Sequence, residues 1–379
     1  MKNAKKWLVK FILLSLTLVT FVIGINFVVD PYGIYKTDFF PKKLNNDNII
    51  RFIKTIKVEE IKPTSISLGN SRAEIGYDPE HKYFLQPSFN LAVSGGTLYE
   101  SRLFLEHAIR QGNVKQVLLV ADWIMFNNVM KKVSNFESYF SINSYSYLFS
   151  LDMLKYSVKT IKNKKNLNLY SNNGFLHTDS SSVPEDGHLK FTIKGEKNFY
   201  QFAGKDNKYM DTKLDSFEDL SKILELCHKN NINLDIIFGP LHIRRLEALD
   251  YYQNIENWYN WKKKVVQYNE KIAKNQNKEP FRIMDFAVYH EITSEKFPTN
   301  TKENMKYYFE SSHYKKELGD IVLDRLLDIS PYKDFGIELN SQNIDSHLQK
   351  LQEDRIKFID TKEYRKEVFG ELYQQKVNN

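Results

Sequence analysis

The chain has 379 residues, 42% of them hydrophobic, which is enough to bury a sizeable core in one large domain or two modest ones. Its formal net charge of +7 is spread along the sequence rather than collected in one block, which favours anionic envelope surfaces over nucleic acid as partners. The sequence has no zinc-finger spacing, glycine-rich phosphate loop or aromatic RNA-binding motif, so no nucleic-acid partner is expected. A single cysteine, Cys227, excludes an internal disulfide.

Residues 1–30 predict a membrane anchor. Lysines precede an uncharged stretch that runs from Phe11 to Val29 and ends at Asp30. About 20 apolar residues suffice to cross a bilayer as a helix, and positive charge before the span keeps the amino terminus in the cytoplasm. We therefore expect a single-pass protein of a bacterial cytoplasmic membrane, with the body on the periplasmic or extracellular side. The alternative is a cleaved signal peptide, although no small-x-small cleavage site follows the apolar run.

From Thr64 onward, short apolar runs alternate with helical stretches, as in a parallel sheet covered by helices. The expected strands are Ser65–Leu68, Ser88–Val93, Gln116–Ala121, Leu234–Phe238 and Phe281–Asp285. The expected helices are Leu98–Gln111, Phe217–Lys229, Asn254–Lys274 and Lys315–Leu327. The pattern predicts an α/β fold, a three-layer α/β/α sandwich with a mainly parallel sheet. In such sheets ligands bind at the carboxyl ends of the strands.

The α/β domain is expected to cover residues 31–330, with an insertion at about 125–212 that is rich in Ser, Asn, Tyr and Lys. Connections this long usually carry a function or a structure of their own. The insertion is either a cap over the site, with aromatic faces for sugar rings, or a solvated segment that packs on the rim. Residues 331–379 are polar and helix-prone, and we expect them to pack on the domain as a helical tail.

Ser71 is the candidate nucleophile. It follows the first expected strand at a tight turn, and the next helix begins close by. A serine in that position exposes its hydroxyl, and nearby backbone N–H groups can stabilise an oxyanion. The alternative is that Ser71 is only a helix N-cap, with Glu74 completing a capping box.

His313 and Glu310 are the candidate base and its orienting carboxylate. A serine needs a base to become a nucleophile, and a histidine needs a carboxylate to hold its tautomer. The two residues stand three apart in a loop before the last expected helix of the domain. From there they can face a serine on another strand together.

Three further residues are expected near the same rim as substrate-binding candidates. His242 follows the fourth strand and either binds substrate or caps a loop. Asp122 follows the third strand as a helix N-cap or a rim carboxylate. Arg72 either binds an anionic group or forms a salt bridge with Glu74 or Asp78. No cluster has metal-ligand spacing, so neither a metal nor another cofactor is expected.

These motifs resemble those of the SGNH, or GDSL-like, hydrolase superfamily, in which a serine comes early and an Asp-x-x-His pair comes late. Leu68–Arg72 (LGNSR) is similar to its first block, and Phe89–Gly96 (FNLAVSGG) to its second. The resemblance implies a flavodoxin-like SGNH fold, with the backbone N–H groups of Ser71 and Gly95 in an oxyanion hole. It is strongest to the membrane-anchored members related to polysaccharide O-acetylation and D-alanylation proteins.

The sequence departs from the family pattern at three places. The third block normally supplies an oxyanion-hole asparagine; here the candidate is Asn127, with Asn128 as a rival. Glu310 stands where aspartate is usual, and Asn70 replaces the more common aspartate of the first block.

The sequence therefore predicts a membrane-anchored serine esterase or O-acyltransferase that acts on acyl esters of an envelope or exported polysaccharide. A transferase would need an acyl donor delivered across the membrane, for which a multi-span acyltransferase is the expected partner. The alternative is a catalytically silent protein of the same fold that binds glycan or assists an assembly complex.

Overall fold

The computed structural model describes residues 2–37, 39–40, 47–127, 136–140, 144–162, 169–179, 182–198 and 206–370. The chain forms two units. The first comprises Met1–Glu60 and Ser134–Tyr170, and the second comprises Ile61–Val133 and Ser171–Asn379. The stretch 125–212, treated as one insertion from the sequence, is therefore divided between the two units.

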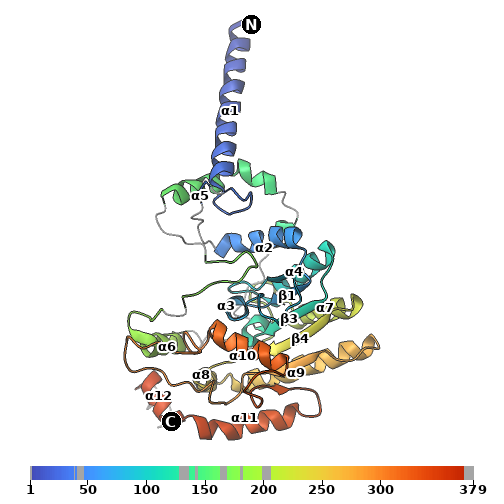
Figure 1. The fold of residues 1–379 in the computed structure, drawn as a ribbon, viewed down its shortest axis with the longest axis vertical. Helices are drawn as coiled ribbons and strands as arrows, with labels where there is room; N and C mark the ends of the chain where they lie inside the picture. The colour runs from blue at the N-terminus through green and yellow to red at the C-terminus, as the bar shows by residue number, and fades with distance from the viewer. Residues whose placement is uncertain are drawn as a thin grey trace. The chain divides into compact units, whose positions relative to one another are not determined.

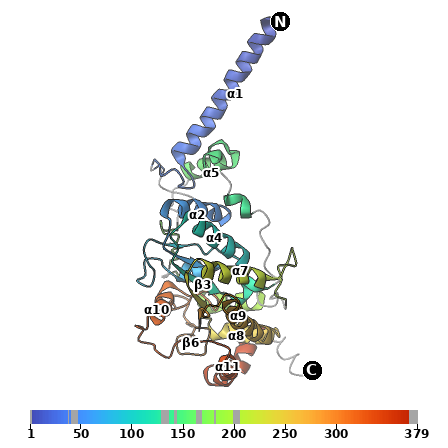
Figure 2. The same cartoon turned by 90° about the vertical axis from the view of Figure 1, so that its right-hand side faces the viewer.

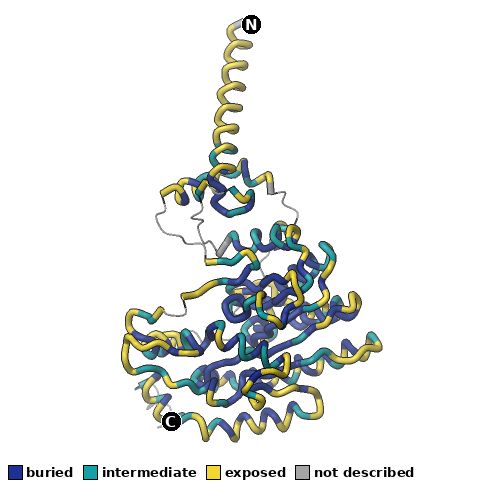
Figure 3. Tube along the Cα trace, viewed as in Figure 1, coloured by how far each residue is buried: buried dark blue, intermediate teal, exposed yellow. Residues whose placement is uncertain are grey.

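The first unit is helical. It contains the long helix α1, the helices α2 and α5 and two 3₁₀ turns: α1 (Lys2–Val29), α2 (Asp47–Ile61), η2 (Phe136–Phe140), η3 (Ser144–Phe149) and α5 (Leu151–Lys162). Most of α1 is exposed along its length (Figure 3). It is long and apolar enough to cross a membrane, by length and composition. The core of the unit is aromatic, built around Tyr32, Phe52 and Met153.

The second unit is built on a six-stranded sheet with the order β2-β1-β3-β4-β5-β6. Its strands are β1 (Ser65–Leu68), β2 (Ser88–Asn90), β3 (Gln116–Ala121), β4 (Asn233–Phe238), β5 (Arg282–Asp285) and β6 (Ile337–Glu338). All neighbours pair in parallel except β6, which is antiparallel to β5. The mixed α/β class and the mainly parallel sheet predicted from the sequence are confirmed. The two-residue edge strand β6 was not predicted.

Along the chain, the helices of this unit lie between successive strands and after the last strand (Figures 1 and 2). They are α3 (Ser71–Gly76), α4 (Leu98–Gln111), η1 (Trp123–Phe126), α6 (Gly187–Asn198), α7 (Ser216–Lys229), α8 (Ile243–Tyr251), α9 (Ile255–Asn275), α10 (Lys316–Leu326), α11 (Ile344–Phe358) and α12 (Thr361–Phe369). Helix α7 packs between α4 and α9, and α10 packs on α3. At the end of the chain, α11 packs on α9, and α12 contacts α6 and α8.

A buried ionic cluster joins the tail to the sheet. Asp285 at the end of β5 pairs with Lys262 of α9 and accepts a hydrogen bond from His347 Nε2 of α11 at 2.8 Å. Lys262 Nζ also lies 3.6 Å from the centre of the Trp258 ring. Burial lowers the pKa of Lys262 to about 8, although the Asp285 carboxylate opposes the shift. Because a buried charge without its partner is costly, each member holds the others in place.

The strand order places a topological switch point at the carboxyl ends of β1 and β3. The chain leaves β1 toward β2 on one side and leaves β3 toward β4 on the other. The chain after β2 continues beside the end of β1, with Leu91 N–H donating to Ser67 O at 2.9 Å. Although β2 ends earlier than the predicted Val93, its extension still lies next to the turn that carries Ser71.

A close helix contact yields a stability prediction. A Cβ atom added at Gly319 of α10 would overlap the carbonyl oxygen of Gly76, the last residue of α3. We expect Gly319→Ala to destabilise the folded protein by about 3 kcal/mol, because two backbones would have to separate. The urea midpoint of the full chain in detergent measures this.

Gly195→Ala is the matched control, because no atom lies within 4 Å of its added Cβ in helix α6. That change should be neutral or stabilise by up to about 1 kcal/mol, as usual for glycine in a helix. Equal midpoints for the two variants would contradict the close packing of α10 on α3.

Candidate active site

Ser71 lies at a sharp strand-to-helix turn. Strand β1 ends at Leu68, and Ser71 is already the first residue of α3. Gly69 allows the turn, because a Cβ there would lie 2.7 Å from the Ala73 Cβ and 3.1 Å from the Val120 carbonyl oxygen. The short connection therefore places Ser71 at the carboxyl edge of the sheet.

Asn70, and not Ser71, caps α3. The Asn70 side-chain oxygen accepts a hydrogen bond from the Arg72 N–H at 3.0 Å, and the Asn70 amide donates to Asp122 Oδ2 at 2.7 Å. Glu74, the expected partner in a capping box, accepts from Ser94 Oγ at 2.7 Å instead. The alternative in which Ser71 and Glu74 form a capping box is therefore wrong, because the turn places the cap one residue earlier.

The structure brings Ser71, His313 and Glu310 together. Ser71 Oγ lies 2.8 Å from His313 Nε2, and His313 Nδ1 pairs with Glu310 Oε1. A carboxylate at Nδ1 favours the tautomer with its proton on Nδ1, which leaves Nε2 free to accept the serine proton. This is the order of contacts that activates a serine.

The Glu310 carboxyl is held in its ionised form. Burial by itself would raise its pKa, but the His313 ring and the Ser312 N–H, which donates to Glu310 Oε2 at 2.7 Å, lower the pKa below the ordinary value. The loop is closed on itself, because Phe309 N–H donates to His313 O at 2.9 Å and Lys315 N–H donates to Tyr307 O at 2.8 Å. The carboxylate and the imidazole are thus fixed by one short turn.

Two buried arginines hold this loop against the rest of the site. Arg72 donates from Nε to Ser312 O at 2.6 Å and from Nη2 to Ser312 Oγ at 2.7 Å. Arg245 of α8 donates from Nη1 to the same hydroxyl at 2.9 Å. Arg72 Nη1 also pairs with Asp122, which follows β3 and caps η1.

Arg72 and Asp122, the predicted substrate-binding candidates, contact each other within the protein. Both side chains are buried, and each is the other's partner within the protein. Arg72 forms a salt bridge with Asp122, a partner that the sequence did not predict. The two residues meet because β1 and β3 are neighbours and both residues follow the carboxyl ends of these strands.

His242 is a buried cap rather than a ligand group. Its Nε2 lies 2.7 Å from Glu295 O, and its Nδ1 accepts from the Arg244 N–H at 3.2 Å as the N-cap of α8. Of the two roles open from the sequence, loop capping is the one the contacts support, because both ring nitrogens are already bonded within the protein.

Two backbone N–H groups beside the serine are candidates for an oxyanion hole. In the described part of the chain, neither the Ser71 nor the Gly95 amide donates to a protein acceptor. Gly95 has a φ of +66°, and the space where a side chain would lie is open. Asn127 is buried at the end of η1, and its side-chain amide lies 3.4 Å from Trp123 O. Its rival, Asn128, lies outside the described residues.

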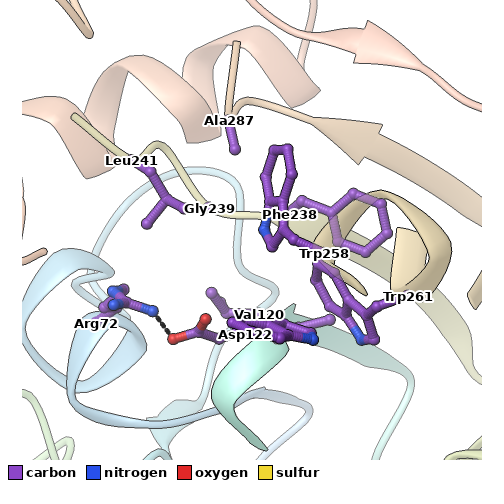
Figure 4. Close-up of a pocket in the computed structure, with 11 residues that line it drawn as sticks. Arg72, Val120, Asp122, Phe238, Gly239, Leu241, Trp258, Trp261 and Ala287 are labelled. Carbon is purple, nitrogen blue, oxygen red and sulfur yellow. Dashed lines mark ion pairs between the residues drawn. The ribbon is translucent and has the colours of Figure 1, made fainter. Parts of the chain in front are cut away.

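A small cavity lies behind the Arg72–Asp122 pair (Figure 4). Its apolar wall includes Phe238, Trp258 and Trp261, which Figure 4 shows around the space. The volume of about 10 Å³ has room for roughly one water molecule. This cavity is therefore too small for a substrate.

Comparisons with known proteins do not assign the chain to a family. No family model matches the sequence, and the comparison with curated proteins returned no match. Within the described ranges, no group of three or more His, Cys, Asp or Glu side chains is placed to hold a metal ion. The site is therefore interpreted from its own geometry.

Sequence reasoning missed Ser312 and Arg245, which connect the parts of the site. Ser312 lies between the two predicted residues Glu310 and His313, but a serine in a loop has no distinctive pattern. Arg245 lies on α8, a nine-residue helix that was not predicted. An arginine three residues after His242 was the only local signal.

The buried His242 predicts a loss of stability in acid. Burial, helped by the nearby Arg244 cation, lowers the pKa of His242 to about 3, whereas a histidine in an unfolded chain titrates near 6.5. The unfolded state therefore takes up the proton first, so this contribution is complete above about pH 6.5 and is lost as the pH falls toward 3. The slope should approach about 1.4 kcal/mol per pH unit.

His242→Asn keeps an acceptor at the N-cap but removes the titrating ring. Urea unfolding of both proteins in detergent, from pH 7 to pH 4, should show wild type losing its advantage over the variant as the pH falls. A stability difference that does not change with pH would show that His242 is not held neutral.

Proposed function

We propose that this protein is a serine esterase or O-acyltransferase that works through Ser71, His313 and Glu310. The observation that carries the proposal is the continuous contact from Ser71 Oγ to His313 Nε2 and from His313 Nδ1 to Glu310. Its position at the switch point of a mainly parallel sheet supports the same interpretation, because ligands bind there in folds of this kind.

In the proposed reaction, His313 Nε2 takes the proton from Ser71 while Oγ attacks the carbonyl carbon of an ester. His313 then gives the proton to the departing alcohol, and the acyl group stays on Ser71. Water, or a sugar hydroxyl in a transferase, loses its proton to His313 and attacks the acyl-enzyme. The bond between the acyl group and Ser71 Oγ then breaks, and His313 returns the proton to Oγ. Glu310 keeps the imidazole oriented and stabilises its cation.

The developing oxyanion would be stabilised by the N–H groups of Ser71 and Gly95. The support is that both amides are unused by acceptors in the described structure and flank the turn after β1 and the turn after β2. Asn127 is the proposed third donor, on its resemblance to the third block alone.

We also propose the finer fold, a three-layer α/β/α sandwich of the SGNH type. The partial strand order β2-β1-β3-β4-β5 supports it, as do an early serine and a late carboxylate–histidine pair. The proposed site departs from that family by using Glu310. The extra methylene does not prevent the contact with His313 Nδ1.

The substrate class is inferred from the proposed location. If α1 anchors the chain in a bacterial cytoplasmic membrane with the body outside, acyl esters of an envelope or exported polysaccharide are the substrates within reach. A multi-span acyltransferase is the proposed source of the acyl group for a transferase. The positive net charge of +7 supports an anionic surface nearby.

Labelling with a fluorophosphonate probe tests the proposal. On the full chain in detergent, we expect one adduct by intact mass, and none on Ser71→Ala. The free energy of unfolding of the variant should stay within about 1 kcal/mol of the wild-type value, because Ser71 does not cap α3. A well-folded protein that forms no adduct would favour the catalytically silent alternative, a glycan-binding or assembly protein.

Glu310→Gln tests the orienting role of the carboxylate. Its single oxygen can stay on the Ser312 N–H, which turns the amide toward His313 Nδ1 and favours the tautomer that cannot accept the serine proton. We expect the rate of ester hydrolysis and of probe labelling to fall on the order of 10³-fold to 10⁴-fold.

Glu310→Asp is the control, because it keeps the charge on a shorter side chain and should retain more activity than the amide. Wild-type rates in Glu310→Gln would remove Glu310 from the proposed mechanism.

A further inference from the structure

A polar residue near the end of the apolar helix is bonded to the segment around α5. Asn26 Nδ2 donates to Leu148 O at 2.9 Å and to Ser150 O at 3.1 Å. Ser157 Oγ of α5 donates to Asn26 Oδ1 at 3.0 Å. Asn26 is fully buried, and the contacts with Leu148 and Ser157 are buried as well. The side chain of Asn26, which is polar in an apolar stretch, therefore has all three of these hydrogen-bond partners within residues 148–157.

These hydrogen bonds hold α5 beside the carboxyl-terminal end of α1, next to Asn26. Asn26 lies three residues before Val29, where the apolar stretch ends, which is about 4.5 Å along a helix. If α1 spans a bilayer, this end of it meets the boundary between acyl chains and headgroups. Helix α5 must lie at that boundary as well, since it belongs to the same unit and packs on α1.

Helix α5 has three different faces. The inner face is buried and contains Met153, Ser157 and Thr160. The outer stripe is apolar and contains Leu151, Leu154, Val158 and Ile161, of which Leu151 is 67% and Ile161 50% exposed. A row of lysines borders the outer stripe: Lys155, Lys159 and Lys162.

The outer stripe continues into the surface of α1. Ile161 lines an open apolar groove of about 820 Å³ together with α1 residues such as Phe21, Ile25 and Val28. Phe149, the last residue of η3, is 60% exposed. The apolar surface proposed to meet lipid on α1 therefore extends without interruption onto α5.

We propose that α5 lies in the surface of the membrane, with the outer stripe among the upper acyl chains and the lysine row at anionic headgroups. An exposed apolar stripe bordered by lysines is the pattern of an interfacial helix. The proposal rests on the proposed anchoring by α1 and is independent of catalysis. The first unit then touches the membrane at two places, so it cannot turn freely about the α1 axis.

Spin labels on the full chain in vesicles of phosphatidylethanolamine and phosphatidylglycerol test this arrangement. The variants are Ile161→Cys in the outer stripe and Lys159→Cys in the lysine row, which lie about 160° apart around the helix. The buried Cys227 stays in place, and wild type treated with the same spin label serves as the control for its reaction. Collisions with oxygen report lipid, and collisions with a water-soluble nickel chelate report solvent.

We expect the ratio of oxygen to nickel collisions to be several-fold higher at Ile161 than at Lys159. Equal, solvent-like ratios at both positions would overturn the proposal, because the stripe would then face water.

Leu16→Cys in the exposed part of α1 separates this failure from a failure of anchoring. A lipid-like label at Leu16 with solvent-like labels on α5 rejects the interfacial helix alone. Solvent-like labels at all three positions reject the anchor, and the interfacial helix with it.

Discussion

The candidate site depends on one hydroxyl group, that of Ser312. It accepts hydrogen bonds from Arg72, which follows β1, and from Arg245 of α8, while Ser312 N–H donates to Glu310. Three segments far apart in the sequence therefore meet at a single loop residue. Because both guanidinium groups are buried, an alternative loop position would cost the hydrogen bonds that their N–H groups donate to Ser312. The turn that carries His313 is fixed for this reason.

The same logic explains why residues predicted to bind substrate turn inward. Asp122 neutralises Arg72, and His242 caps the helix whose first turn carries Arg245. Asp122 thus acts on Ser312 through Arg72, and His242 acts on it through the helix that carries Arg245. In the proposed site, the serine, the imidazole and the two backbone amides after β1 and β2 are the groups assigned to the reaction. The polar groups around them serve to position that small set.

The first unit uses buried polar contacts in a similar way. Asn26 joins α1 to α5, and Asp30 at the end of α1 accepts hydrogen bonds from the Ile34 and Tyr35 N–H groups at 2.8 and 3.1 Å. Apolar contacts alone would not fix the path of the chain after the helix. The hydrogen bonds of Asn26 and Asp30 fix this path, and the hydrophobic cluster around Phe52 packs in the same unit.

Periodicity in the sequence determined the five parallel strands, the long helices between them and the apolar helix α1, because burial on two faces, on one face or in lipid each leaves its own spacing of apolar residues. The spacing of Glu310 and His313 and the turn before Ser71 also identified the candidate triad. Only the tertiary structure decided that Asn70 caps α3, that Arg72 pairs with Asp122 and that Ser312 joins two arginines. Those choices depend on which strand ends become neighbours in the sheet. Local sequence carries no record of such distant partners, since hydrogen bonds across 240 residues depend on the fold as a whole.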